Sequence, residues 1–147
     1  TKSAKILDGD SIRHRTGDLG YKDEKGRIWF CGRKNHRVET SEGLMYTVCC
    51  EAIYNNHKDV FRSALVGIGE RPNQKPVIII EPHKMPQSQK GKESLNKELL
   101  ELGKINPLTR GIDPVLFHNS FPVDIRHNAK IFREKLALWA RSELERL

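Results

Sequence analysis

The chain has 147 residues and a formal net charge of +7, with 37% hydrophobic and 31% charged residues. This balance is typical of a soluble globular protein, and no apolar run approaches the roughly 20 residues that a membrane-spanning helix needs. The basic residues are scattered among nearly as many acidic ones, without the base-stacking aromatic pattern of an RNA-binding sheet. We therefore expect a nucleotide-sized anion as ligand, and neither a nucleic acid nor a membrane span.

The three cysteines and the polar N-terminus indicate a cytoplasmic protein with reduced thiols. Cys49 and Cys50 are adjacent, where a mutual disulfide would be strained. No second Cys or His pair stands at zinc-ligand spacing, so no metal site is expected. The chain opens in mid-pattern without a methionine, which predicts that it is a piece of a longer protein.

The first 34 residues are predicted to form short strands over 4–7 and 12–15, followed by a hairpin. Two apolar runs flank the charged stretch 22–26, where Gly26 supplies the positive φ of a tight turn. This pairing would bring Asp18 and Arg33 to the same end of the hairpin. A carboxylate that accepts from a diol, beside a guanidinium, would suit a ribose. A solvated surface ion pair is the alternative.

Residues 36–147 are predicted to form a small α+β domain in the order β-α-β-β-α-β-α. The helical pattern starts at Thr47 as N-cap and ends near residues 55–57. Strands are expected over 60–68, 77–80 and 115–118, and 83–92 is expected to be a mobile loop. Ser94 is predicted to cap a second helix that ends near Gly103, and 131–147 is amphipathic with a core-facing stripe.

Lys130 is predicted to lie on a loop tip at the start of the last helix, after a turn at 128–129. A cation opposes the positive end of the helix dipole. It is therefore either a tolerated surface lysine or one presented to a ligand. Arg126 and His127 are expected to shape the loop, and Arg133 to pair within its helix or with the first 34 residues.

Three segments together resemble the adenylate-forming superfamily of acyl-CoA synthetases, peptide-synthetase adenylation domains and luciferases. They are Arg15-Thr-Gly-Asp-Leu-Gly, then Gly32-Arg33, then Lys130-Ile-Phe-Arg-Glu-Lys-Leu. The match spans essentially the whole chain but only the C-terminal part of the family's usual length. The resemblance implies that residues 1–34 end the large adenylation domain and that 35–147 form its mobile C-terminal lid.

The same resemblance implies roles for individual residues. Asp18 would hold the ribose hydroxyls of ATP or AMP, with Arg33 assisting, and Phe30 would line the adenine pocket. Asn35 would be the hinge. Lys130 would be the catalytic lysine that meets the negative charge between the carboxylate and the α-phosphate.

The full-length protein would then use ATP and Mg²⁺, and this fragment alone should be inactive. It lacks a Gly-rich phosphate loop, an acyl pocket and an identifiable magnesium ligand. The missing N-terminal adenylation domain is therefore an expected partner.

Where the sequence departs from the superfamily's motifs, it resembles one branch of the superfamily more than the others. Glu39 stands where a lysine is common, Leu44-Met45-Tyr46 replace a Gly-x-Arg-Ile segment that helps to admit a thiol, and Asn-Ala precede Lys130 in place of Ser-Gly. The stretch 123–136 is similar to the β-lactone synthetases of bacterial long-chain olefin biosynthesis. That branch adenylates a 2-alkyl-3-hydroxy fatty acid, whose own hydroxyl then expels AMP. Because the nucleophile is part of the substrate, such an enzyme needs no channel for the thiol of coenzyme A. A role for coenzyme A is therefore in question.

Two other functions stay open at this point. One is a medium- or long-chain fatty acyl-CoA ligase or acyl-AMP ligase. The other is a non-enzymatic basic interaction module. Membership of the olefin branch would also leave open an assembly with other enzymes of that pathway.

Overall fold

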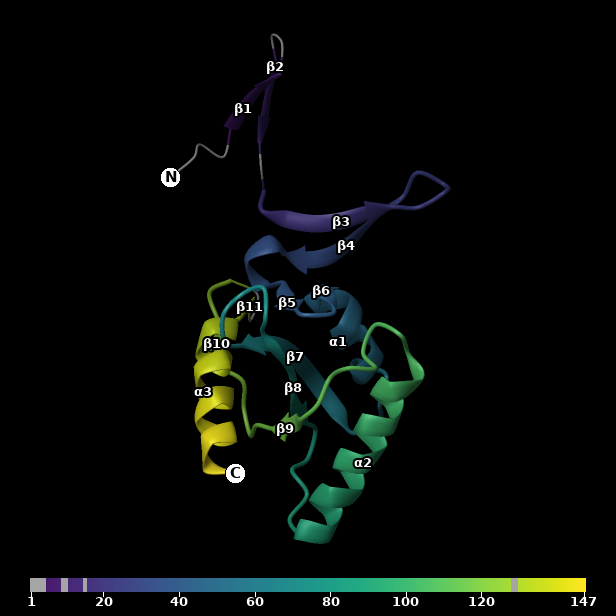
Figure 1. The fold of residues 1–147 in the computed structure, drawn as a ribbon, viewed down its shortest axis with the longest axis vertical. Coiled ribbons are helices and arrows are strands. Elements are labelled where there is room, and N and C mark those ends of the chain that lie inside the picture. Colours follow the sequence, from purple (N-terminus) through teal and green to yellow (C-terminus); the bar gives the residue numbers. More distant parts are fainter. Residues whose placement is uncertain (1–4, 9–10, 15, 128–129) are drawn as a thin grey trace.

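The computed structural model describes residues 5–8, 11–14, 16–127 and 130–147. At its centre is a three-stranded sheet of order β7-β8-β9, formed by β7 (Val60–Ile68), β8 (Lys75–Pro82) and β9 (Val115–Phe117). β7 and β8 are antiparallel, and β8 and β9 are parallel. Helices α1 (Thr47–Asn55) and α2 (Gln89–Ile105) pack on one face of this sheet, and α3 (Arg133–Arg146) packs on the other (Figure 1). The predicted α+β class is confirmed.

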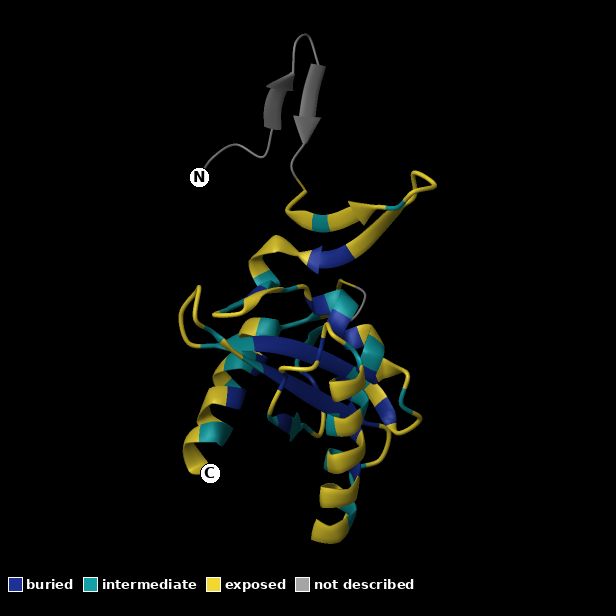
Figure 2. Cartoon of the chain, turned by 45° about the vertical axis from the view of Figure 1, so that its right-hand side comes forward, coloured by how far each residue is buried: buried dark blue, intermediate teal, exposed yellow. Residues whose placement is uncertain are grey.

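The continuous apolar run of β8 forms the centre of both cores. Ile78 and Ile80 pack with residues of α1 and α2, whereas Val77 and Ile79 pack with residues of α3. All four side chains have 0% exposure (Figure 2). Successive side chains of a strand point to opposite faces, so only a strand covered on both faces can be apolar throughout. Full burial of one such side chain is worth about 1.5–3 kcal/mol.

Two predicted helix caps are wrong. The N-cap of α1 is Tyr46, and Thr47 is the first helical residue, with its side chain buried. The N-cap of α2 is Ser88, whose hydroxyl accepts from the Gly91 N–H at 3.0 Å. The helix therefore begins well before Ser94, and the end of the segment predicted as a mobile loop is its polar first turn. Within the described part of the chain, no helix is both long and apolar enough to cross a membrane.

The remaining strands form two-stranded ribbons. They are β1 (Lys5–Asp8) with β2 (Ser11–His14), β3 (Asp18–Lys22) with β4 (Ile28–Arg33), β5 (Val38–Thr40) with β6 (Gly43–Met45), and β10 (Val123–Asp124) with β11 (Lys130–Ile131). The predicted hairpin around Gly26, with φ of 79°, is confirmed. The β5–β6 and β10–β11 ribbons were not predicted. The turn expected at 128–129 lies outside the described residues.

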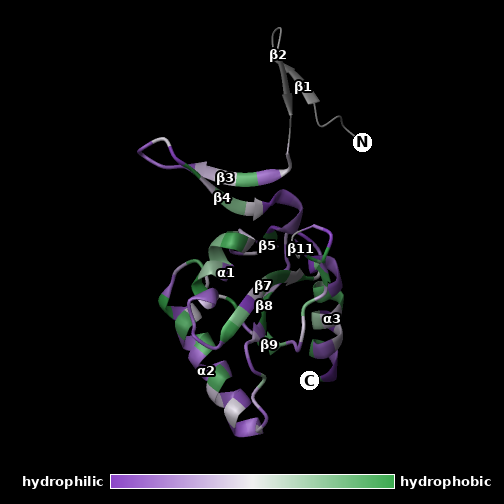
Figure 3. Ribbon diagram, turned by 180° about the vertical axis from the view of Figure 1, so that it is seen from behind, coloured by the Kyte–Doolittle hydropathy of each residue, from purple (hydrophilic) through white to green (hydrophobic). Residues whose placement is uncertain are grey.

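The hairpin β3–β4 is joined to the rest of the fold where β4 packs against α1. Gly32 has φ of 118°, and a Cβ at that position would lie 2.5 Å from the Thr47 hydroxyl oxygen. Only glycine allows this backbone approach. Figure 3 shows hydrophobic residues on both β4 and α1, which face each other at this junction. The three cysteines, Cys31 on β4 and Cys49 and Cys50 on α1, are free thiols.

His118 follows β9 and is packed edge-on against aromatic rings. Its ring centroid lies 4.6 Å from that of Trp139 and 5.8 Å from that of Phe121. Its Nδ1 accepts the Ser120 N–H at 3.1 Å, which fits a neutral imidazole. Burial lowers the pKa of His118, and this effect exceeds the opposing attraction of nearby carboxylates.

We expect folding stability to decrease as the pH falls through about 6.5, the ordinary histidine pKa. His118 binds a proton less readily in the folded state than in the unfolded chain. Its contribution to the free energy of unfolding is therefore fully present above that pH. Urea unfolding at pH 7.5 and 5.5 measures the difference. His118→Gln should reduce the difference, and an equal pH dependence in both proteins would contradict this assignment.

Candidate functional site

An ion pair marks the open end of the β3–β4 hairpin. Asp18 and Arg33 are register partners, and Arg33 Nη1 donates to Asp18 Oδ1 at 2.8 Å and to the Thr16 carbonyl oxygen at 2.9 Å. The side chains are 39% and 44% exposed, respectively. The hairpin thus brings the two predicted ligand-binding residues together at an accessible corner. A carboxylate there can accept from hydroxyl groups, and a guanidinium can donate to oxygens.

The predicted hinge, Asn35, lies in a short 3-10 helix, η1 (Lys34–His36), directly after this corner. Its side chain is exposed, and its carbonyl oxygen accepts from Arg71 Nη2 at 2.7 Å. The same nitrogen donates to the Arg37 carbonyl oxygen at 3.0 Å. Arg71, from the β7–β8 loop, therefore holds the backbone within η1 and directly after it. Sequence reasoning missed this contact because it joins residues far apart in the chain.

Lys130 is not at the start of a helix, as predicted, but in β11, where it pairs with Asp124 of β10. Helix α3 begins three residues later, at Arg133, so the argument from the helix dipole does not apply. Its side chain is exposed. A lysine held by a strand pair, with an exposed side chain, suits the presentation of a charge to a ligand.

Lys130 borders a hollow of about 400 Å³ that it shares with residues from η1 and α3. There His36 Nε2 lies 3.3 Å from Glu134 Oε1, which joins the hinge segment to the first turn of α3. Burial lowers the pKa of His36, and the nearby Arg133 guanidinium acts in the same direction. The structure thus brings Lys130 beside the hinge.

The loop before Lys130 is shaped by one carboxylate. Asp124 Oδ2 lies 2.7 Å from His127 Nδ1, and Asp124 Oδ1 accepts the Arg126 N–H at 3.0 Å. The structural role expected for Arg126 and His127 is thus confirmed by these contacts. The expectation for Arg133 is wrong: it pairs neither within α3 nor with the hairpin but with the buried Glu51 of α1.

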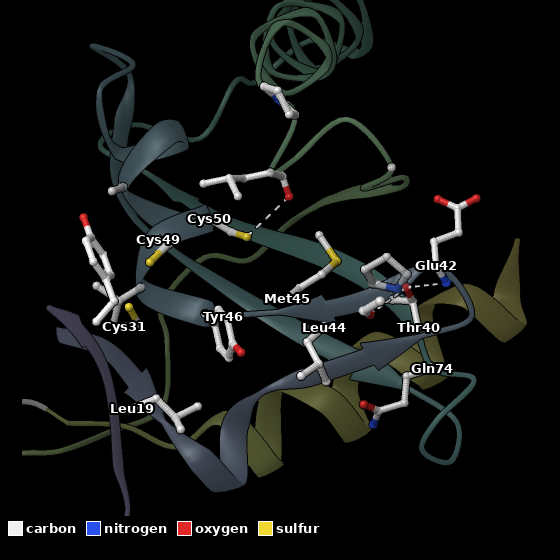
Figure 4. A pocket seen from close by; sticks show the side chains of 18 of the residues that line it. Leu19, Cys31, Thr40, Glu42, Leu44, Met45, Tyr46, Cys49, Cys50 and Gln74 are labelled. Atoms are coloured by element: carbon white, nitrogen blue, oxygen red, sulfur yellow. Dashed lines mark hydrogen bonds between the residues drawn. The ribbon is translucent and has the colours of Figure 1, made fainter. Parts of the chain in front are cut away.

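Phe30 lies on β4, is 53% exposed and borders a cleft of about 1140 Å³. This cleft lies between the hairpin and the β5–β6–α1 segment, and Figure 4 shows Leu44, Met45 and Tyr46 among the side chains that line it. Among the described residues that line it, Glu42 carries the one formal charge and none is basic. The predicted role of Phe30 against adenine stays a prediction.

One cluster of potential metal ligands was not predicted. His57, Asp59 and Glu98 each place a ligand atom within 4.8 Å of the others. His57 Nε2 lies 2.9 Å from Glu98 Oε2, and its Nδ1 accepts the Asp59 N–H. These contacts tie the end of α1 to α2. They account for the cluster as a set of hydrogen bonds, and we assign it no metal.

Comparison with proteins of known function gives two relatives over nearly the whole chain. An olefin β-lactone synthetase of Xanthomonas campestris is 47% identical over 97% of this chain, and one of Stenotrophomonas maltophilia is 45% identical over 99%. The chain is a homologue of the olefin β-lactone synthetases. It spans only 26–27% of the length of these two relatives. No protein-family model matches it.

More distant relatives and solved structures agree with this relationship. A 4-chlorobenzoate–CoA ligase of an Arthrobacter species is 36% identical over 45% of the chain. An anthranilate CoA ligase solved with anthranoyl-AMP matches 90% of the chain with a TM-score of 0.74, at 20% identity and over 24% of its own length. An amide bond synthetase of Marinactinospora thermotolerans matches 89% of the chain with a TM-score of 0.70, also at 20% identity and over 25% of its length. These structures show that the fold is shared with part of such enzymes.

Proposed function

We propose that this chain belongs to an ATP-dependent enzyme that adenylates a 2-alkyl-3-hydroxy fatty acid in the cytoplasm and converts it to a β-lactone. The observation that carries the proposal is the 45–47% identity with two olefin β-lactone synthetases across nearly the whole chain. The exposed corner of Asp18 and Arg33 and the outward Lys130 beside the hinge supply groups that suit this chemistry.

In the first step, a carboxylate oxygen of the acid attacks the α-phosphorus of ATP, and pyrophosphate leaves with the electron pair of the broken P–O bond. Asp18 accepts hydrogen bonds from the ribose hydroxyls, and Arg33 orients Asp18. Lys130 brings its ammonium to the oxygens on which negative charge accumulates. A fixed cation at such a position stabilises the transition state more than the ground state.

In the second step, the 3-hydroxyl oxygen attacks the acyl carbon and closes the four-membered ring. AMP leaves with the electron pair of the acyl–oxygen bond, and the hydroxyl proton passes to a base or to solvent. Because the nucleophile belongs to the same molecule, no second substrate has to be bound and oriented.

Residues 1–34 would end the large domain and 35–147 would form the lid, with Asn35 as hinge and Phe30 against the adenine. ATP brings Mg²⁺ with it. Asp18 is engaged by Arg33, and we assign no Mg²⁺ ligand to the described residues. The phosphate-binding and acyl-binding parts, and any other pathway enzymes, would lie outside this chain.

A fatty acyl-CoA ligase is the second candidate, because the chain also matches a 4-chlorobenzoate–CoA ligase over 45% of its length. The longer matches, at 45–47% identity with olefin β-lactone synthetases over nearly the whole chain, favour the lactone proposal instead.

The test uses the intact protein with ATP, Mg²⁺ and a racemic 2-alkyl-3-hydroxy acid, with and without coenzyme A. We expect β-lactone, AMP and pyrophosphate in both reactions, separated and identified by mass. The 147-residue chain alone should give none of them. Faster formation of an acyl-CoA than of a lactone would overturn the lactone proposal in favour of the ligase.

A further inference from the structure

A buried carboxylate of α1 accepts three hydrogen bonds from two distant parts of the chain. Glu51 is 6% exposed. Its Oε1 accepts from Arg133 Nη2 at 2.7 Å, and its Oε2 accepts from Arg133 Nη1 and from the Leu65 N–H. Burial raises the pKa of Glu51, and the Arg133 guanidinium acts against that rise. The pair thus joins α1 to the first residue of α3 across β7.

A gain in the free energy of unfolding does not explain why such a buried ion pair is present. Two charges lose their hydration when they are buried, and well-packed apolar side chains of similar volume are often as stabilising. A bidentate guanidinium–carboxylate pair does fix the distance and orientation of two backbone segments. The role of the pair is therefore to be found in the relative position of the two backbone segments that it joins.

The segment fixed by Arg133 is the one that carries Lys130. Phe132, the N-cap of α3, donates its N–H to the Pro122 carbonyl oxygen at 2.9 Å. Lys130 itself pairs with Asp124 through a ribbon only two residues long. Such a short ribbon is weak by itself. The tie between Glu51 and Arg133 is thus a buried anchor three residues from a lysine whose side chain is exposed.

We propose that Glu51 and Arg133 are positioning residues that hold the β11–α3 junction. They keep the backbone of Lys130 where its ammonium can reach the α-phosphate of ATP during adenylation. This inference rests on the proposed function, because it assumes that Lys130 acts in adenylation. A displacement of about 1 Å in a catalytic group can cost a hundredfold in rate. Neither residue touches the substrate, so the effect passes through Lys130.

The experiment measures ATP–pyrophosphate exchange and thermal unfolding in the intact protein. Glu51→Gln leaves Arg133 without its anion and can destabilise the lid, so it is paired with Glu51→Gln/Arg133→Met, which removes both charges. Both variants should lower kcat by about 10- to 100-fold with little change in KM for ATP. The control is Leu99→Ala, which opens a cavity on the opposite face of the sheet, away from α3. It should lower the unfolding temperature and leave kcat near wild type at temperatures where the protein is folded.

A double-mutant cycle separates positioning from general damage. If Glu51 acts through Lys130, adding Glu51→Gln to Lys130→Ala should cause no further loss of rate. Additive losses, or a wild-type kcat in the two Glu51 variants, would overturn the inference and leave the role of Lys130 intact. A wild-type rate in Lys130→Ala alone would instead overturn that role and this inference with it.

Discussion

Replacing Lys130 with alanine in the intact protein is expected to slow adenylation by ~10²- to 10⁴-fold, the range for one positioned electrostatic or acid–base group. Lys130 is exposed and is held by its backbone pairing with Asp124. Its removal therefore takes away charge from the site without opening a cavity or leaving a buried group unpaired. The unfolding temperature should change little, because exposed substitutions away from such features usually have small effects. ATP–pyrophosphate exchange measures the rate.

Lys135→Ala is the matched control for this prediction. Lys135 is also exposed and belongs to α3, and its ammonium lies 4.6 Å from the centroid of the Phe132 ring. Its removal changes the net charge of the lid by the same amount as Lys130→Ala does. Exchange should stay close to the wild-type rate. Equal losses in the two variants would indicate that the general positive charge of the lid matters and would contradict a specific role for Lys130.

The sequence predicted those parts of the fold that depend on local pattern. The strands expected over 60–68 and 77–80 correspond to β7 and β8, the two long strands of the central sheet. The glycine of the charged turn identified the β3–β4 hairpin, and the pairing across it predicted that Asp18 and Arg33 lie at the same end. Each of these signals is contained within fewer than twenty consecutive residues. The signals of β7 and β8 reflect burial of the strands, and that of the hairpin reflects the turn at Gly26.

The start of α2 was missed because its first turn carries no apolar residue. The segment Gln89–Lys92 contains Gly91 and is polar, so hydrophobic periodicity begins only at Leu95. The cap that starts the helix is the Ser88 hydroxyl bound to the Gly91 N–H. A serine followed by three polar residues gives a weak sequence signal, and Ser94, directly before Leu95, gave a stronger but false one.

The arrangement of the candidate site was predicted only in part. Sequence motifs proposed Asp18, Arg33 and Lys130, and the hairpin pattern placed Asp18 and Arg33 at the same end of the hairpin. They did not identify the partners that hold this region, Arg71 on the hinge and Glu51 on Arg133. These partners lie 36 and 82 positions away in the chain. Contacts over such separations depend on the packed fold, and no local propensity encodes them.

Replacing Asp18 with alanine in the intact protein is expected to raise KM for ATP by about 10- to 100-fold. A hydrogen bond to a charged group contributes about 1.5–3 kcal/mol, and each 1.4 kcal/mol corresponds to about tenfold in affinity. Arg33 should stay near its place, because it also donates to the Thr16 carbonyl oxygen. Initial rates at increasing ATP concentrations, with the acid at saturation, measure this change.

Asp23 offers a matched control at the other end of the same hairpin. Its carboxylate also pairs with an arginine, Arg27, at 2.7 Å, and it accepts from Trp29 Nε1 at 2.9 Å. Asp23→Ala removes the same charge and loosens the same hairpin, but it leaves the corner of Asp18 and Arg33 in place. If loosening the hairpin were the cause of weak ATP binding, the two variants would behave alike. A higher KM for ATP in Asp18→Ala alone would show that the ligand contact lies at the Asp18 end, and equal values would contradict the assigned ribose contact.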